Sequence, residues 1–181
     1  MVYKKRGQFY LLAAIVIIAL LIGFASLTNY ISKKGEVKIY DLKEELGIES
    51  GQVLDYGTYG RYSTEDFNKL LENFTRTYTD FAGAGKELYF VFGNKDGINV
   101  ATYSEVSTGS ISLNIGGGQS IIIDIKENEY NITKVNNPEK EDKIRILIGN
   151  IPYDIELTEG QNFYFIISQE ISGEVYIESN K

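Results

Sequence analysis

The sequence predicts an α+β protein: an N-terminal transmembrane helix, then one or two helices, then an antiparallel β-sandwich-like domain. Three observations predict this order. Residues 7–32 carry no charged side chain, apolar residues recur at helical spacing from 67 to 81, and polar and apolar residues alternate from Glu87 onward. The expected division is a basic leader over 1–7, a transmembrane helix over 8–34, a helical connector over 35–85 and an antiparallel β domain over 86–181.

The first apolar segment is long enough to cross a bilayer. Phe9–Leu27 contains 19 residues, which as a helix span roughly 28 Å, close to the ~30 Å hydrocarbon core. The basic residues that flank this segment are Lys4, Lys5, Arg6, Lys33 and Lys34. The N-terminal flank is short and dense in charge, which predicts a single-pass protein of the cell membrane with a cytoplasmic N-terminus and an extracellular C-terminal domain.

A cleaved secretory signal peptide is the alternative interpretation of this segment. Gly23-Phe24-Ala25 offers small residues at which such a peptide could be cut. However, the apolar region of a signal peptide is usually about 7–15 residues long, which is shorter than the segment found here. Retention as an anchor is therefore the favoured interpretation.

The basic residues run directly into the apolar segment through Gly7, Gln8, Phe9 and Tyr10. This junction resembles the class III signal peptide of archaeal type IV pilin-like proteins. The resemblance implies that a prepilin peptidase cuts between Gly7 and Gln8, and that the apolar helix stays as an anchor able to pack against like subunits. Many pilins have Glu at the fifth residue of the mature chain, where this sequence has Leu12. The resemblance is confined to the N-terminal segment.

The composition argues against several classes of function. All 25 acidic residues and only 13 of the 18 basic residues lie from Gly35 onward, so this part of the chain has a net charge of −12. Such a surface repels phosphate backbones, and nucleic acid is not an expected partner. The chain contains no Cys and no His, the commonest general base and transition-metal ligand. We therefore expect no cofactor, no metal site and no catalytic activity.

Two helices are predicted after the membrane segment. Ile39–Leu46 has apolar residues at helical spacing, and Val53-Leu54 offer a continuation of this helix past Gly47 and Gly51. The two glycines weaken the case for one unbroken helix, so both alternatives stay open. Gly57 and Gly60 are expected to bracket a turn.

The second predicted helix has clear start and stop signals. Ser63 or Thr64 can cap its N-terminus, and Gly83 is expected to end it. Its apolar residues form one stripe, which we expect to pack on the sheet: Phe67, Leu70, Leu71, Phe74, Tyr78 and Phe81.

The sequence from Glu87 to the C-terminus predicts nine short strands. They are expected at 87–93, 98–104, 110–115, 120–126, 129–134, 143–149, 152–158, 162–168 and 173–178. Leu88–Phe92 and Phe163–Ile167 are continuous apolar runs, so these two strands are expected to lie centrally. Asp154 and Glu156 alternate with apolar residues, which is typical of a strand with one solvated face. Short strands at this spacing favour a sandwich.

A few polar residues are candidates for a functional role. Asp154 and Glu156 share one strand face, an arrangement that also fits the two carboxylates of a glycosidase. A solvated face is the favoured interpretation. Asn94 and Asp96 lack the bidentate Glu of a calcium loop and are better explained by a turn. The sequons at Asn73 and Asn131 offer glycosylation sites.

The expected function is that of a membrane-anchored cell-surface subunit, a pilin-like structural or adhesive component. The alternative is a non-polymerising anchored binding module of the cell envelope, which Leu12 in place of Glu favours. A hydrolase that works with carboxylates alone is the third hypothesis. The lipid bilayer is the expected partner, with like subunits or envelope components as further partners.

Overall fold

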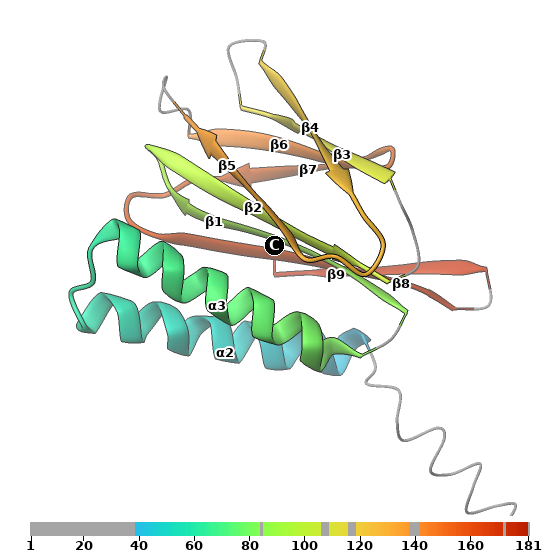
Figure 1. The fold of residues 1–181 in the computed structure, drawn as a ribbon, viewed down its shortest axis with the longest axis horizontal. Helices are drawn as coiled ribbons and strands as arrows, with labels where there is room; N and C mark the ends of the chain where they lie inside the picture. The colour runs from blue at the N-terminus through green and yellow to red at the C-terminus, as the bar shows by residue number, and fades with distance from the viewer. Residues whose placement is uncertain are drawn as a thin grey trace, which may run out of the picture. The chain divides into compact units, whose positions relative to one another are not determined.

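A computed structural model of the chain describes residues 39–83, 85–105, 109–115, 119–137, 142–171 and 173–180. The chain divides into two units between Val37 and Lys38, and the described residues all belong to the second unit. This unit is α+β, with two helices followed by strands in two antiparallel sheets that form a sandwich-like arrangement (Figure 1). The predicted transmembrane helix over 8–34 lies outside the described residues. Within the described ranges, no helix combines the length and apolar character needed to cross a membrane.

The first helix of the unit, α2 (Ile39–Tyr59), runs unbroken through Gly47 and Gly51. Of the two alternatives, the continuation past both glycines is therefore the one observed. The turn expected to begin at Gly57 was wrong, because Gly57 lies inside the helix. Glycine lowers helix propensity by only about 1 kcal/mol, and burial of an apolar face readily outweighs that cost. The buried residues of α2 that supply this compensation are Ile39, Leu42 and Leu46.

The second helix, α3 (Thr64–Ala82), begins as predicted. The Ser63 hydroxyl accepts a hydrogen bond from the Asp66 backbone N–H at 3.2 Å, and Gly83 follows the last turn with a φ of 76°. Phe67, Leu71 and Tyr78 are buried as expected.

Phe81 is 51% exposed, so its placement in the packed stripe was wrong. The buried side of α3 is turned instead toward Thr75, Thr79 and Ala82, which leaves Phe81 on the flank. Tyr78 links α3 to α2 directly, because its hydroxyl donates a hydrogen bond to the Leu42 carbonyl at 3.1 Å.

All nine predicted strands are present, with ends shifted by a few residues. The five-stranded sheet, called sheet A, has the order β5-β2-β1-β8-β9. Its strands are β1 (Lys86–Asn94), β2 (Gly97–Ser104), β5 (Asn131–Asn136), β8 (Asn162–Ile171) and β9 (Glu174–Ser179). The four-stranded sheet, called sheet B, has the order β4-β3-β6-β7. Its strands are β3 (Gly109–Asn114), β4 (Ser120–Ile125), β6 (Lys143–Ile148) and β7 (Ile151–Glu156).

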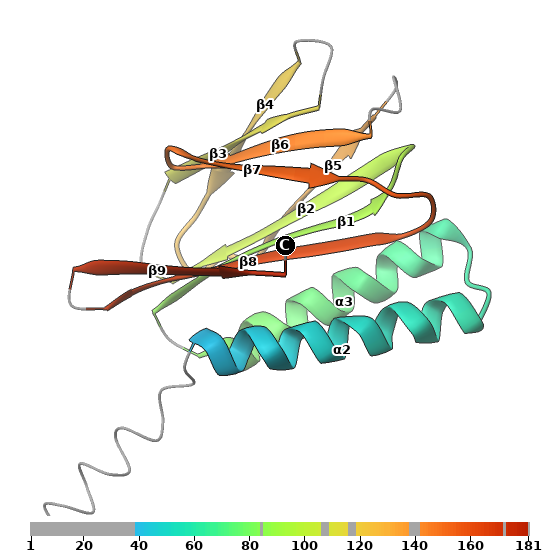
Figure 2. The same cartoon turned by 180° about the vertical axis from the view of Figure 1, so that it is seen from behind.

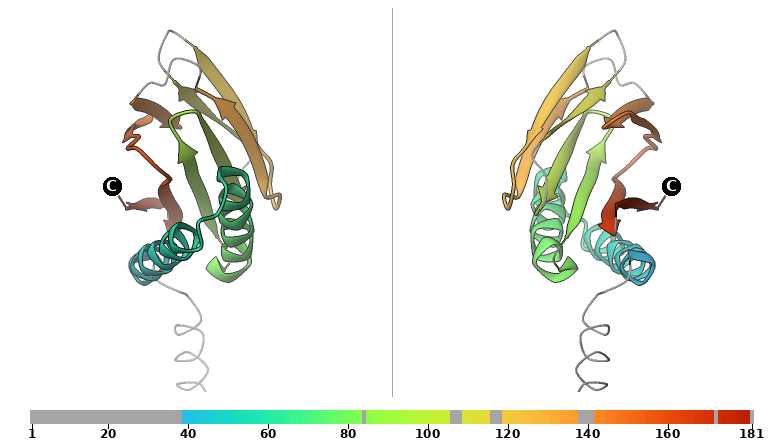
Figure 3. Two further views of the ribbon diagram at one scale, coloured as in Figure 1. Left: turned by 90° about the vertical axis from the view of Figure 1, so that its left-hand side faces the viewer. Right: turned by 90° about the vertical axis from the view of Figure 1, so that its right-hand side faces the viewer.

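Sheet A is covered on both faces. The helices lie against one face and sheet B lies on the opposite side, as the front and back views show (Figures 1 and 2). In the end-on views α3 lies beside β1 and β2, whereas α2 lies beside β8 and β9 (Figure 3). Between the two sheets an aliphatic core forms from alternate residues of both, including Val91, Val100, Leu113, Ile146 and Ile155.

An aromatic cluster fills the space between sheet A and the helices. The ring of Phe163 lies at its centre, with centroid distances of 5.8 Å to Phe74 of α3 and 6.0 Å to Phe90 of β1. The rings of Phe92 and Phe165 lie 6.4 and 6.5 Å away from it. Because β1 and β8 supply side chains to both cores, the prediction that their apolar runs lie centrally is confirmed.

We predict that Phe163→Ala lowers the free energy of unfolding by about 3–5 kcal/mol, because it removes a buried ring that four others contact. Phe81→Ala is the matched control, since its ring is half exposed, and we expect a loss below about 1 kcal/mol. Urea titration followed by circular dichroism measures both. Equal losses for the two variants would contradict the placement of the cluster.

We predict opposite effects for two alanine substitutions in α2. A Cβ atom at Gly57 would lie 2.5 Å from Cε2 of Phe67, so Gly57→Ala should destabilise the protein by about 1–3 kcal/mol. At Gly51 a Cβ atom would meet no other atom within 4 Å, so Gly51→Ala should stabilise it by about 0.5–1 kcal/mol. Thermal unfolding measures the difference, and a stabilising Gly57→Ala would show that α2 and α3 do not approach as described.

Candidate functional site

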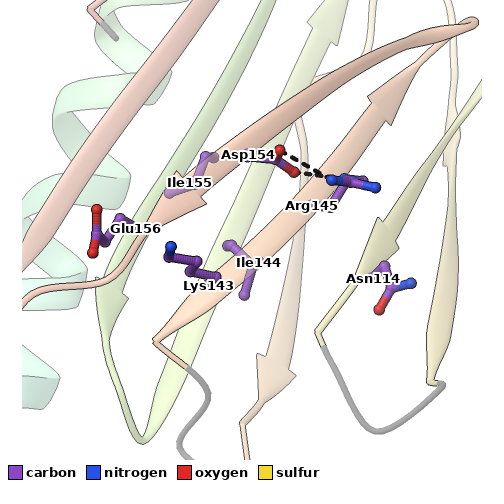
Figure 4. Close-up of a pocket in the computed structure, with 7 residues that line it drawn as sticks. All are labelled: Asn114, Lys143, Ile144, Arg145, Asp154, Ile155 and Glu156. Atoms are coloured by element: carbon purple, nitrogen blue, oxygen red, sulfur yellow. Dashed lines mark hydrogen bonds and ion pairs between the residues drawn. The ribbon is translucent and has the colours of Figure 1, made fainter.

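The outer face of sheet B, opposite the aliphatic core, carries a shallow polar pocket of about 370 Å³. Figure 4 shows the residues that line it, which are Asn114, Lys143, Ile144, Arg145, Asp154, Ile155 and Glu156. They come from β3, β6 and β7, three strands that are adjacent in sheet B. The pocket is therefore built by strand register rather than by loops.

Arg145 is the central residue of the pocket. It is paired in register with Asn114 of β3 on one side and with Asp154 of β7 on the other. Its guanidinium group donates from Nε to Asp154 Oδ1 at 2.5 Å and from Nη2 to Asp154 Oδ2 at 3.0 Å. These hydrogen bonds raise the pKa of Arg145 above its ordinary value. Both side chains are more than half exposed, so water screens the attraction between them.

A second cross-strand pair, Lys143 and Glu156, lies two positions along the same strands. Ile144 and Ile155 occupy the intervening positions and are buried in the aliphatic core. The alternation predicted for β7 is thus confirmed, and Asp154 and Glu156 do face solvent. Both carboxylate oxygens of Asp154 are bonded to Arg145, so a glycosidase-like role for this carboxylate finds no support in the geometry.

The chemistry that this pocket offers is hydrogen bonding in both directions. Arg145, Lys143 and Asn114 supply N–H donors, while Asp154, Glu156 and Asn114 supply oxygen acceptors. The two basic and two acidic side chains balance in charge. The arrangement suits a neutral polar ligand, such as a group of sugar hydroxyls or a peptide backbone, and no aromatic ring among its lining residues would stack on such a ligand.

The turn between β1 and β2 accounts for two of the other predicted candidates. The side-chain oxygen of Asn94 accepts hydrogen bonds from the backbone N–H groups of Asp96 and Gly97, at 3.0 and 3.2 Å. This oxygen therefore stabilises the hairpin, and the turn interpretation is confirmed. No group of three or more acidic side chains with a geometry able to hold a metal ion is found among the residues that the structure describes.

The two sequons occupy different positions. Asn73 is exposed on α3. Asn131 is half-buried at the start of β5, an edge strand of sheet A. The expected processing residues, Gly7 and Gln8, lie outside the described residues, as do the basic residues that flank the membrane segment, Lys4, Lys5, Arg6, Lys33 and Lys34.

One buried polar residue was not anticipated from the sequence. Asn162, which is 5% exposed at the start of β8, accepts hydrogen bonds from the backbone N–H and the hydroxyl of Thr158 at 2.9 and 2.8 Å. Its amide donates to the carbonyls of Thr158 and Gly160, so it fixes the connection from β7 to β8. In the sequence, the only signal for this role was the position of Asn162 between the turn at Glu159-Gly160 and the apolar run Phe163–Ile167.

No protein-family model matches the chain, and neither a curated protein nor a solved structure is detectably similar to it. The function has to be inferred from the chain's own residues.

Proposed function

We propose that this protein is a membrane-anchored cell-surface subunit, a pilin-like structural or adhesive component without catalytic activity. The observation that carries the proposal is the N-terminal sequence, in which three basic residues and the Gly7-Gln8 junction lead directly into the apolar segment Phe9–Leu27. A helix of this length satisfies all of its backbone hydrogen bonds inside a bilayer. The resemblance of the junction to class III signal peptides supports processing between Gly7 and Gln8.

The α+β domain is suited to display at a membrane surface. The domain buries two separate cores and contains no Cys, so its stability does not depend on disulfide formation in the compartment where it resides. Its acidic surface favours solubility at high local concentration.

A non-polymerising anchored binding module is the second candidate function. Leu12 stands where many pilins have the Glu that is thought to assist subunit docking. The polar pocket around Arg145 and Asp154 offers such a module a place to bind an envelope component. In either case the sequon at Asn73 lies on an exposed helix face, where a glycan would not disturb the packing.

We predict that the chain extracted from membranes of its native host begins at Gln8. Intact-mass measurement and sequencing of the N-terminal peptide test this directly. A Gly7→Leu variant should keep the leader, because the resemblance places the scissile bond after Gly7. Leu12→Ala is the control and should still be processed, since it lies within the apolar segment beyond the junction.

Three results are informative. A chain that begins at Gln8 supports the pilin-like subunit and justifies a search for filaments by electron microscopy. A membrane-bound chain that begins at Met1 or Val2 contradicts processing and favours the anchored module. A soluble chain that begins after Gly23–Ala25 would contradict the anchor itself.

A further inference from the structure

Strand β9 is an edge strand with little protection. Among the described residues it pairs only with β8, and none of its residues is fully buried. Val175 is 61% exposed, although it is a β-branched apolar residue in a strand. Edge strands present a row of unpaired backbone groups and usually carry features that prevent further pairing, such as Pro, Lys or a bulge. The sequence of β9, Glu-Val-Tyr-Ile-Glu-Ser, contains neither Pro nor Lys, and its charged residues are Glu174 and Glu178.

Two other edges of the sandwich do carry such features. Strand β7 has Pro152, which cannot donate a backbone hydrogen bond. Strand β5 carries the exposed Lys134, and Asn131 of its sequon lies at its start. Strand β4 resembles β9, since Ile122 is 70% exposed, and serves below as the comparison edge.

An apolar groove of about 350 Å³ lies along the inner face of β9. Val175 and Ile177 form one wall, and the β6–β7 hairpin forms the other with Ile148 and Ile151. Ile151 is 47% exposed, so the hairpin wall is also accessible. An extended chain paired with β9 would place every second side chain on this side of sheet A.

The charges around the groove indicate what kind of chain fits. Glu87 is the only charged residue in its lining. In the β8–β9 hairpin Glu170 is paired in register with Val175 and shares the groove side. Glu174 and Glu178 alternate with Val175 and Ile177 and lie on the other face of β9, where Glu178 is bonded to Lys43 at 2.6 Å. An added strand presents its second set of side chains beside this acidic face. Antiparallel pairing of β9 with β9 of a second copy would bring Glu174 close to the like-charged Glu178. A second copy is therefore disfavoured and a basic chain is favoured.

We propose that β9 and its groove bind an extended basic segment of a partner protein, which adds a strand to the edge of sheet A. Backbone hydrogen bonds to β9 provide affinity, and the groove selects apolar side chains at alternate positions. The surface belongs to the β domain, so the proposal does not depend on whether residues 8–34 anchor the chain or on how the leader is processed.

The test uses the full chain in detergent micelles and a fluorescent probe peptide of about seven residues in which lysine and valine alternate, long enough to span a strand of this size. Fluorescence anisotropy should show saturable binding that weakens as the salt concentration rises, because the attraction to the acidic hairpin is screened. A peptide of alternating glutamate and valine should not bind. Hydrogen exchange of the amides in β9 should slow when the lysine–valine peptide is added.

Two matched variants separate this site from a general attraction to the acidic surface. Val175→Lys places a charge at the groove and should weaken binding by roughly tenfold or more. Ile122→Lys makes the same change on an exposed isoleucine of another edge strand and should leave the affinity unchanged. Both positions are exposed, so both variants are expected to fold.

Several outcomes would overturn the proposal. The proposal is wrong if the two variants bind the lysine–valine peptide with equal affinity. It is also wrong if the peptide slows amide exchange in β4 and not in β9, or if it shows no saturable binding. Exchange in β9 that is already slow in the free protein would show that another part of the chain, or a second copy, covers the edge. Failure of this test leaves the mass measurement of the N-terminus unaffected, so the two proposals can fail separately.

Discussion

Strands β1 and β8 have to be buried on both faces, because their central runs, Leu88–Phe92 and Phe163–Ile167, are continuously apolar. In β1 the side chains of Leu88, Phe90 and Phe92 point to the helices, while Tyr89 and Val91 point to sheet B. Each fully buried side chain of this size contributes about 1.5–3 kcal/mol, so exposure of either face would cost much of the stability of the domain. One covering layer cannot satisfy such a strand. The helix pair on one side and sheet B on the other follow from this requirement.

The sequence was most informative where burial and periodicity agree. The two continuous apolar runs predicted the central strands, the stripe on α3 predicted that this helix packs on the sheet, and Ser63 predicted where it begins. The errors arose where tertiary contacts override local preference. Gly57 is helical because this side of α2 is buried beside Phe67, and Phe81 lies outside the core because α3 is rotated toward Thr75. The strand order was not predictable, since β1 is paired with β8, which lies far away along the chain.

Contacts between polar side chains at the surface were harder to predict from the sequence than the buried core. Alternation along β7 predicted that Asp154 is exposed, but it did not reveal that Arg145 is its partner, because that contact depends on the register between β6 and β7. Asn162 was missed for a related reason. Its hydrogen bonds hold the connection from β7 to β8, and the path of this connection depends on how far β8 extends. A single polar residue beside a turn does not predict that path. The groove along β9 was not predictable either, because residues of both sheets line it.

The central claim is that sheet A, buried on both faces, forms the most stable part of the domain. Native-state hydrogen exchange measured residue by residue under mildly denaturing conditions tests this most directly. We expect the amides of β1 and β8 to exchange last, at a rate set by global unfolding, and those of sheet B and of the last turns of α2 to exchange earlier. If sheet B or the helices kept their protection after β1 and β8 had lost theirs, the account would be contradicted.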